Sequence, residues 1–165
     1  MLRFFFILLV APTLAFSQSD SDFGFPVPID LEARRELLGR DFPSMDPSIP
    51  QLDRLLAYRR GLEIYRVTVL EAFNAKIEDV CLELEKVERR VNAAFARGDL
   101  SRNEKTNYDI RIRDLRLECL VDNYEKSRYW QLYDTFLQLY RSESSTSLAA
   151  LDRCYVNDNC RSRQD

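Results

Sequence analysis

Apolar residues recur at helical spacing along two long stretches of the chain, on either side of a short polar turn. Most of them are three or four positions apart, which is the period of one face of an α-helix. The first stripe comprises Leu52, Leu55, Leu62, Tyr65, Val69, Phe73, Ile77, Val80, Leu84, Val87, Val91 and Phe95. The second comprises Tyr108, Ile112, Leu115, Cys119, Tyr129, Tyr133, Phe136 and Tyr140. The pattern therefore predicts two long helices.

The residues between the two stripes predict a tight turn. Gly98 directly follows the first stripe, at a position where helix C-termini favour a glycine in the left-handed conformation. Ser101 and Glu104 have the S-x-x-E spacing of a capping box, which marks the start of a helix. We therefore expect an all-α fold built on a long, coiled-coil-like antiparallel two-helix hairpin over residues 48–141.

The four cysteines predict two disulfides. Facing residues of an antiparallel pair have position numbers with a nearly constant sum, which is about 200 for a turn centred near residues 99–100. Cys81 and Cys119 satisfy this relation, so we expect a disulfide between them. Cys154 and Cys160 are then left to close a short loop in the C-terminal tail.

A second apolar set in the second stretch predicts that the hairpin packs against a third element. The set comprises Ile110, Leu117, Val121, Tyr124, Leu132 and Leu139. The N-terminal segment 18–47, the C-terminal segment 142–165 and a second copy of the chain are the candidates. The first contains a predicted short helix, Leu31–Leu38. In the second, a serine-rich break at Ser142–Ser147 precedes a predicted short helix, Leu148–Tyr155.

Composition supports an exported helical protein. The chain has 165 residues, only 4 glycines, and no proline after Pro50, so nothing in the backbone forbids helix beyond that point. Residues 1–17 have the organisation of a secretory signal, with Arg3 before a short apolar run and small residues at Ala15 and Ser17. We expect cleavage before Gln18 and a secreted or periplasmic protein that does not insert into the membrane after signal removal.

Charge and chemistry exclude several functional classes. The net charge is −3 and both signs are interspersed, which argues against nucleic acid as a partner. The absence of histidine removes Ser/His/Asp and Cys/His catalysis. The exposed carboxylates are expected to form a solvated face. We therefore expect no enzymatic activity, no cofactor and no metal site, since Asn157–Asn159 lacks the spacing of a calcium loop.

The tripeptide Arg97-Gly98-Asp99 matches the sequence that integrins recognise in displayed loops, although ordinary turn chemistry explains it equally well. An aromatic-rich part of the second stretch is a stronger candidate for partner binding, because tyrosine and tryptophan contribute large contact areas. We expect core packing for most of these rings, and a partner-binding role for Trp130, Tyr124 and Tyr133.

Two short segments, Leu52–Tyr58 and Cys119–Arg128, are similar to parts of small secreted helical lysozyme inhibitors of bacteria. The Trp-x-x-x-Arg-Asp core of that family does not occur between them. The main functional prediction is an exported non-catalytic interaction module that binds another protein or itself. An inhibitor of a cell-wall or extracellular enzyme is one alternative, as the resemblance implies. A carboxylate-dependent hydrolase is the alternative from another class.

Overall fold

A computed structural model describes residues 23–119 and 127–156. Within these ranges the chain is mostly helical and contains no β-strand. The elements are α1 (Leu31–Arg40), α2 (Gln51–Tyr65), the π-helical segment η2 (Arg66–Leu70), α3 (Glu71–Arg97), α4 (Arg102–Cys119) and α5 (Arg128–Val156). The predicted signal peptide, residues 1–17, lies outside the described residues.

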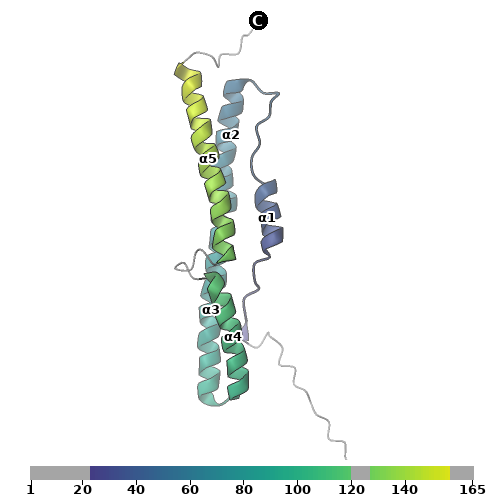
Figure 1. The fold of residues 1–165 in the computed structure, drawn as a ribbon, viewed down its shortest axis with the longest axis vertical. Coiled ribbons are helices and arrows are strands. Elements are labelled where there is room, and N and C mark those ends of the chain that lie inside the picture. The colour runs from purple at the N-terminus through teal and green to yellow at the C-terminus, as the bar shows by residue number, and fades with distance from the viewer. Residues whose placement is uncertain (1–22, 120–126, 157–165) are drawn as a thin grey trace, which may run out of the picture.

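The molecule is a rod organised around one long helical element (Figure 1). α2, η2 and α3 follow one another without a break. α4 packs on α3, and α5 packs on α2 and more lightly on η2. The N-terminal segment runs along the rod, and α1 lies beside its middle part, against α5. The predicted second long helix is therefore divided into two helices, one ending at Cys119 and the next beginning at Arg128.

The turn between α3 and α4 forms as the sequence predicts. Gly98 has φ 82° and ψ 11°, the left-handed conformation that a side chain would disfavour. Its N–H donates to the Phe95 carbonyl, and the Asp99 N–H donates to the Ala94 carbonyl, both at 3.0 Å. The capping box is also present, because the Ser101 N–H donates to the Glu104 carboxylate at 2.7 Å and the Glu104 N–H donates to Ser101 Oγ at 3.2 Å.

The buried stripe of the long element departs from the prediction at η2 and at its last position, where Ala94 is buried and Phe95 is exposed. It comprises Leu55, Tyr58, Leu62, Tyr65, Leu70, Phe73, Ile77, Val80, Leu84, Val87, Val91 and Ala94. Its steps alternate between three and four residues except from Tyr65 to Leu70, a step of five that spans η2. The wider π-turn absorbs one additional residue and returns the stripe to the same side of the rod. Leu70, at 1% exposure, therefore takes the core position that the sequence analysis gave to the half-buried Val69.

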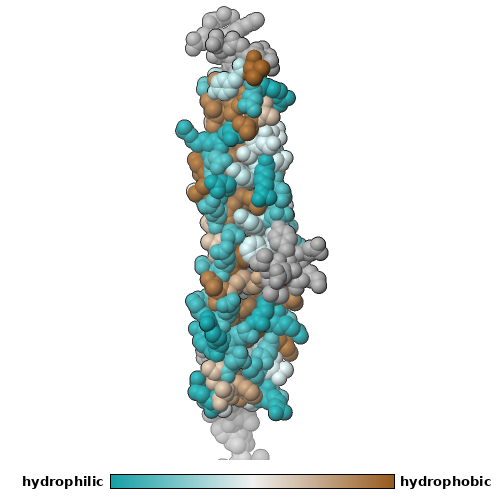
Figure 2. Space-filling view, turned by 90° about the vertical axis from the view of Figure 1, so that its left-hand side faces the viewer, coloured by the Kyte–Doolittle hydropathy of each residue, from teal (hydrophilic) through white to brown (hydrophobic). Residues whose placement is uncertain are grey.

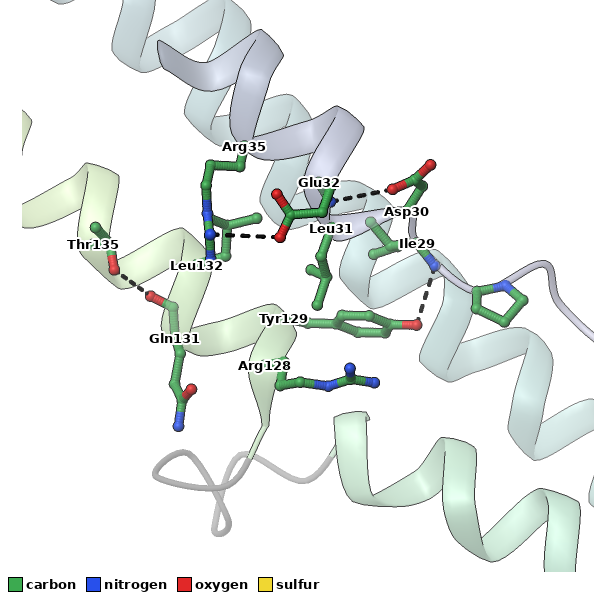
Figure 3. A pocket seen from close by; sticks show the side chains of 11 residues that line it. Ile29, Asp30, Leu31, Glu32, Arg35, Arg128, Tyr129, Gln131, Leu132 and Thr135 are labelled. Atoms are coloured by element: carbon green, nitrogen blue, oxygen red, sulfur yellow. Dashed lines mark hydrogen bonds and ion pairs between the residues drawn. The ribbon is translucent and has the colours of Figure 1, made fainter.

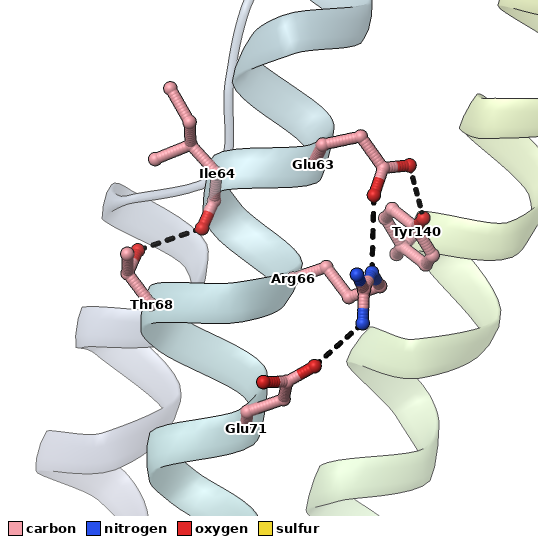
Figure 4. Close-up of polar contacts among 6 residues, drawn as sticks. All are labelled: Glu63, Ile64, Arg66, Thr68, Glu71 and Tyr140. Atoms are coloured by element: carbon pink, nitrogen blue, oxygen red, sulfur yellow. Dashed lines mark hydrogen bonds and ion pairs between the residues drawn. The ribbon is translucent and has the colours of Figure 1, made fainter.

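Polar contacts fix η2 in place (Figure 4). The Thr68 hydroxyl donates to the Ile64 carbonyl at 2.8 Å, one turn back. The Arg66 guanidinium pairs with Glu63 at 3.1 Å and with Glu71 at 2.6 Å. Glu63 also accepts a 2.6 Å hydrogen bond from the Tyr140 hydroxyl of α5. The π-turn is thus held to its own helix on one side and to α5 on the other.

The N-terminal segment supplies a third packing element. Leu38 of α1 is fully buried, and the Tyr65 hydroxyl donates to its carbonyl at 3.0 Å. Phe42 packs edge-on against Tyr65, at 4.9 Å between ring centroids. Farther along the rod, Phe23 and Phe25 pack against Tyr108 of α4. Of the second apolar set, Leu132 is buried, Ile110, Leu117 and Leu139 stay exposed, and Val121 and Tyr124 lie outside the described residues.

The C-terminal segment corrects another prediction. α5 continues through residues 142–147 to Val156, so the expected serine-rich break does not form. Ser147 is buried, and its hydroxyl donates a 3.0 Å hydrogen bond to the Ser144 carbonyl. The same carbonyl accepts a 3.1 Å hydrogen bond from the Arg59 guanidinium of α2. Packing against α2 thereby overrides the modest helix propensity of serine.

Cys154 is disulfide-bonded, and its predicted partner Cys160 lies outside the described residues. Cys154 packs with Leu55 and Leu151, which form a small core between α2 and the end of α5. Among the described helices, none is long and apolar enough to cross a membrane.

Candidate functional site

The Cys81–Cys119 disulfide fixes the end of α4 on the middle of α3. The two residues are separated by 38 positions, and their Cα atoms lie 5.4 Å apart. This pairing confirms the first predicted disulfide. The bridge holds the two helices together at the point where α4 ends.

A network of hydrogen bonds connects α5 to the same point. Ser127, which is fully buried, donates from its hydroxyl to the Glu118 carbonyl at 2.6 Å. The same hydroxyl accepts from the Trp130 N–H at 3.4 Å and so caps the first turn of α5. The Glu118 carboxylate accepts from the backbone N–H and from Nε of Arg128, both at 2.9 Å. These bonds place Trp130 beside the disulfide.

The disulfide and Trp130 border a groove, which we call the disulfide groove. Its lining residues are Glu78, Cys81, Leu82 and Glu85 from α3, Cys119 from α4 and Trp130 from α5, and its volume is about 290 Å³. Glu78, Leu82 and Glu85 follow i, i+4, i+7 spacing, so they lie on one face of α3. Leu82 is 55% exposed, which makes it an apolar side chain available for contact.

Two of the three predicted partner-binding residues come together next to this groove. The Trp130 and Tyr133 rings are in edge-on contact at 6.2 Å between centroids, and Tyr133 also contacts Phe73 at 6.5 Å. Both side chains are half-buried against the main core. Trp130 Nε1 is buried without a hydrogen-bond partner in the described part of the chain. Tyr124, the third predicted residue, lies outside the described residues.

The carboxylates of α3 differ in their ion pairing, and the two in the disulfide groove, like Asp79, have no cationic partner among the described residues. Glu71 pairs with Arg66, Glu83 with Lys86 and Glu88 with Arg116. Glu78 accepts a 2.7 Å hydrogen bond from the neutral amide of Asn74. Neither Glu78 nor Glu85 forms an ion pair with a described residue, so the groove carries negative charge that no described cation neutralises.

A second and larger pocket surrounds Tyr129 and holds about 590 Å³ (Figure 3). Its lining residues are Pro28, Ile29, Asp30, Leu31, Glu32, Arg35, Arg128, Tyr129, Gln131, Leu132 and Thr135. Most of its charged groups already have local partners. Asp30 caps α1 through two backbone N–H groups at 3.1 Å, and Arg35 pairs with Glu32 at 3.5 Å. Tyr129 accepts a 3.0 Å hydrogen bond from the Ile29 N–H. These contacts anchor the N-terminal segment.

The second pocket could not be predicted from local sequence patterns, because its walls come from segments about 100 positions apart. The expected solvated face of exposed carboxylates includes Glu78 and Glu85, which also border the disulfide groove. The available signal was local, since both lie on the helix face that includes Leu82 and are adjacent in space to Cys81. The predicted disulfide would have marked that face as the border of a groove.

The electrostatics of the described carboxylates give no indication of a general acid. Each carboxyl group with a shifted pKa in residues 23–119 and 127–156 is shifted downward. Hydrogen bonds from Ser48, Tyr140, Lys86 and Ser101 lower the pKa values of Asp46, Glu63, Glu83 and Glu104, respectively. A carboxylic acid that donates a proton near neutral pH needs a raised pKa.

The Arg97–Asp99 motif lies within the described residues. In the Arg97-Gly98-Asp99 tripeptide, Arg97 Nε pairs with the Asp99 carboxylate at 2.8 Å, so the two charged side chains bind each other within the turn. Among the described residues, no three His, Cys, Asp or Glu side chains gather as metal ligands. Asn157–Asn159 lies outside the described residues.

The fold and the site together define a disulfide-bonded, all-α protein with an acidic, partly apolar groove between three helices. Comparisons of the chain with protein-family models, with curated proteins and with solved structures found no significant match. The similarity to lysozyme inhibitors therefore stays a prediction from two short segments.

Proposed function

We propose that the protein is an exported, non-catalytic interaction module that binds another protein through the disulfide groove. The observation that carries this proposal is an exposed apolar side chain, Leu82, between two unpaired carboxylates on a helix clamped by a disulfide. A rigid surface that mixes apolar and charged groups binds a partner with little loss of conformational freedom. We place the protein in the periplasm or outside the cell, where disulfides persist.

The clamped hairpin forms the frame of this module in our account. Steps of three and four residues along α3 are typical of coiled-coil packing. The disulfide holds α3 and α4 in register, and the capped start of α5 keeps Trp130 next to them. On the face shown in Figure 2, apolar residues occur in separated patches among hydrophilic ones. The disulfide groove combines such a patch with a fixed geometry.

The position and electrostatics of the carboxylates favour binding over catalysis. Glycoside hydrolysis requires two carboxyl groups across a cleft, one of them with a raised pKa. Glu78 and Glu85 instead lie on one face of a single helix. An inhibitor of an extracellular or cell-wall enzyme belongs to the same binding class, and only the identity of the partner separates it from other interaction modules.

Affinity capture with matched surface variants tests the proposal. The mature protein, its Leu82→Arg variant and its Ile64→Arg variant serve as baits in the native compartment. Leu82 and Ile64 are both 55% exposed, but Ile64 lies on α2, away from the groove. We expect a specific partner with wild type and Ile64→Arg, and its loss with Leu82→Arg. Equal capture by all three baits would contradict the proposal.

A further inference from the structure

We propose that the occupant of the disulfide groove is a lysine or arginine side chain of the partner protein. This inference rests on the proposed function and specifies the chemistry of the same site. The groove contains two carboxylates without ion-pair partners among the described residues, above an apolar surface. A long basic side chain has the complementary structure, with an apolar stem and a cationic end.

The geometry of α3 sets the spacing of the negative charges. Glu78 and Glu85 are seven residues apart, which corresponds to about 10 Å along the helix axis. Leu82 lies between them on the same face. A basic side chain that crosses this face packs its methylene groups on Leu82 and brings its cation within reach of either carboxylate.

Trp130 extends the apolar side of the groove. Indole rings are the preferred aromatic partners of lysine and arginine cations. Arginine stacking already occurs elsewhere in this fold, since the Arg111 guanidinium lies 4.2 Å from the centre of the Phe25 ring and that of Arg34 lies 5.3 Å from the centre of Phe73.

The second pocket lacks this unsatisfied charge. There, Glu32 pairs with Arg35, Asp30 accepts two backbone N–H groups, and Arg128 already pairs with Glu118 outside the pocket. A cation entering that pocket would compete with an arginine already in place. Charge complementarity therefore favours the disulfide groove as the site for a basic side chain.

Trp130 is the only tryptophan in the chain, so intrinsic tryptophan fluorescence reports on this groove alone. The probes are three capped alanine-based helical peptides that carry arginine, glutamine or glutamate at every fourth position. We expect the arginine peptide to produce a saturable change in Trp130 emission, and we expect no change with the other two.

Two double variants with equal charge change provide the control. Glu78→Gln with Glu85→Gln removes the groove carboxylates, and we expect it to weaken binding of the arginine peptide at least about tenfold, because a charge-assisted hydrogen bond is lost. Asp79→Asn with Glu83→Gln removes two carboxylates of α3 that do not line the groove, and we expect it to change the affinity by less than about twofold.

Several outcomes would overturn the inference. Equal weakening by both double variants would show general attraction to an acidic protein. Analytical ultracentrifugation shows whether the protein is a dimer. A dimer that dissociates in the Glu78→Gln, Glu85→Gln variant but not in the control variant would identify a second copy of the chain as the occupant of the groove. If a Glu78→Gln, Glu85→Gln bait still captures the partner that Leu82→Arg loses, the interaction module stands and the basic side chain is excluded. If no bait captures a partner, the proposed function itself fails.

Discussion

The hydroxyl of Ser127 donates a 2.6 Å hydrogen bond to the carbonyl of Glu118, which joins the start of α5 to the last turn of α4. That carbonyl lies in the last turn of α4. The same serine oxygen caps α5 through the Trp130 N–H. One buried hydroxyl therefore fixes the relative position of two helices and of the tryptophan at the disulfide groove.

Replacing Ser127 with alanine should destabilise the protein by about 1–3 kcal/mol, because it removes a helix cap and the hydrogen bond to the partly buried Glu118 carbonyl. Urea unfolding followed by circular dichroism measures this loss. The control is Ser145→Ala, an exposed position in the same helix, which should be neutral or slightly stabilising. Equal stability of both variants would show that the Ser127 contacts contribute nothing.

Deleting Thr68 should be tolerated, because η2 contains one residue more than an ordinary α-helix needs at this point. Without that residue, the buried positions would keep their alternating spacing of three and four residues. The deletion brings Leu70 four positions after Tyr65 and allows an ordinary α-helix. We expect a free energy of unfolding within about 1 kcal/mol of wild type.

Deletion of Ala75, an exposed residue of α3, is the matched control for the Thr68 deletion. It shifts the stripe out of register without any π-turn to absorb the change at that point. We expect a loss of more than about 3 kcal/mol, on the scale of removing a large core side chain. Similar losses from the two deletions, measured by chemical denaturation, would refute the role assigned to η2.

Replacing Cys81 and Cys119 together with serine should lower the free energy of unfolding by roughly 4 kcal/mol, the chain-entropy value for a bridge across 38 positions. The double variant is preferable to a reductant, since Cys154 also forms a disulfide. Trp130 emission should change as well, because the residue lines the same groove as the bridge. A loss below about 1 kcal/mol would show that the clamp has little effect on stability.

Stability should fall in strongly alkaline solution because of two core tyrosines. Burial and the contact with Glu143 raise the pKa of Tyr58 from 10.0 to about 12. Burial and the charge of Asp41 raise the pKa of Tyr65 by the same amount, from 10.0 to about 12. Below pH 10 both phenols keep their protons in the folded and unfolded states. Between pH 10 and about 12 the unfolded state ionises first, so unfolding becomes more favourable.

Urea unfolding at about pH 9 and about pH 11 measures this alkaline loss of stability. Tyr65→Phe should reduce the loss between the two conditions, since it removes a phenol whose pKa is raised in the folded state. Tyr155→Phe, at an exposed position, should leave the loss unchanged. If wild type has the same free energy of unfolding at both pH values, ionisation of the buried tyrosines does not lower its stability.

Local chemistry made the turn and the first disulfide predictable. Gly98 and Ser101 fixed where the chain reverses, and the reversal fixed which cysteine meets Cys81. The π-turn was hidden because Val69 and Leu70 are both apolar, so the stripe could pass through either one. Local spacing favoured Val69, whereas the packing of α3 against its neighbours selected Leu70.

The helix through residues 142–147 and the two pockets depend on contacts between distant segments. Arg59 and the buried Ser147 stabilise the serine-rich stretch as helix, which local propensity alone does not favour. The disulfide groove forms only where α3, the Cys81–Cys119 disulfide and Trp130 come together, and these are far apart in the sequence. The sequence identified Trp130 as a candidate contact residue, but not the acidic face of α3 opposite it.

Site-specific photocrosslinking tests the central claim most directly. A photoreactive phenylalanine analogue at position 82 lies in the disulfide groove, and the same analogue at position 64 is an equally exposed control on α2. After irradiation in the native compartment, we predict a discrete crosslinked product with another protein from position 82 and none from position 64. The same products from both positions, or no product from position 82, would contradict an interaction module that works through this groove.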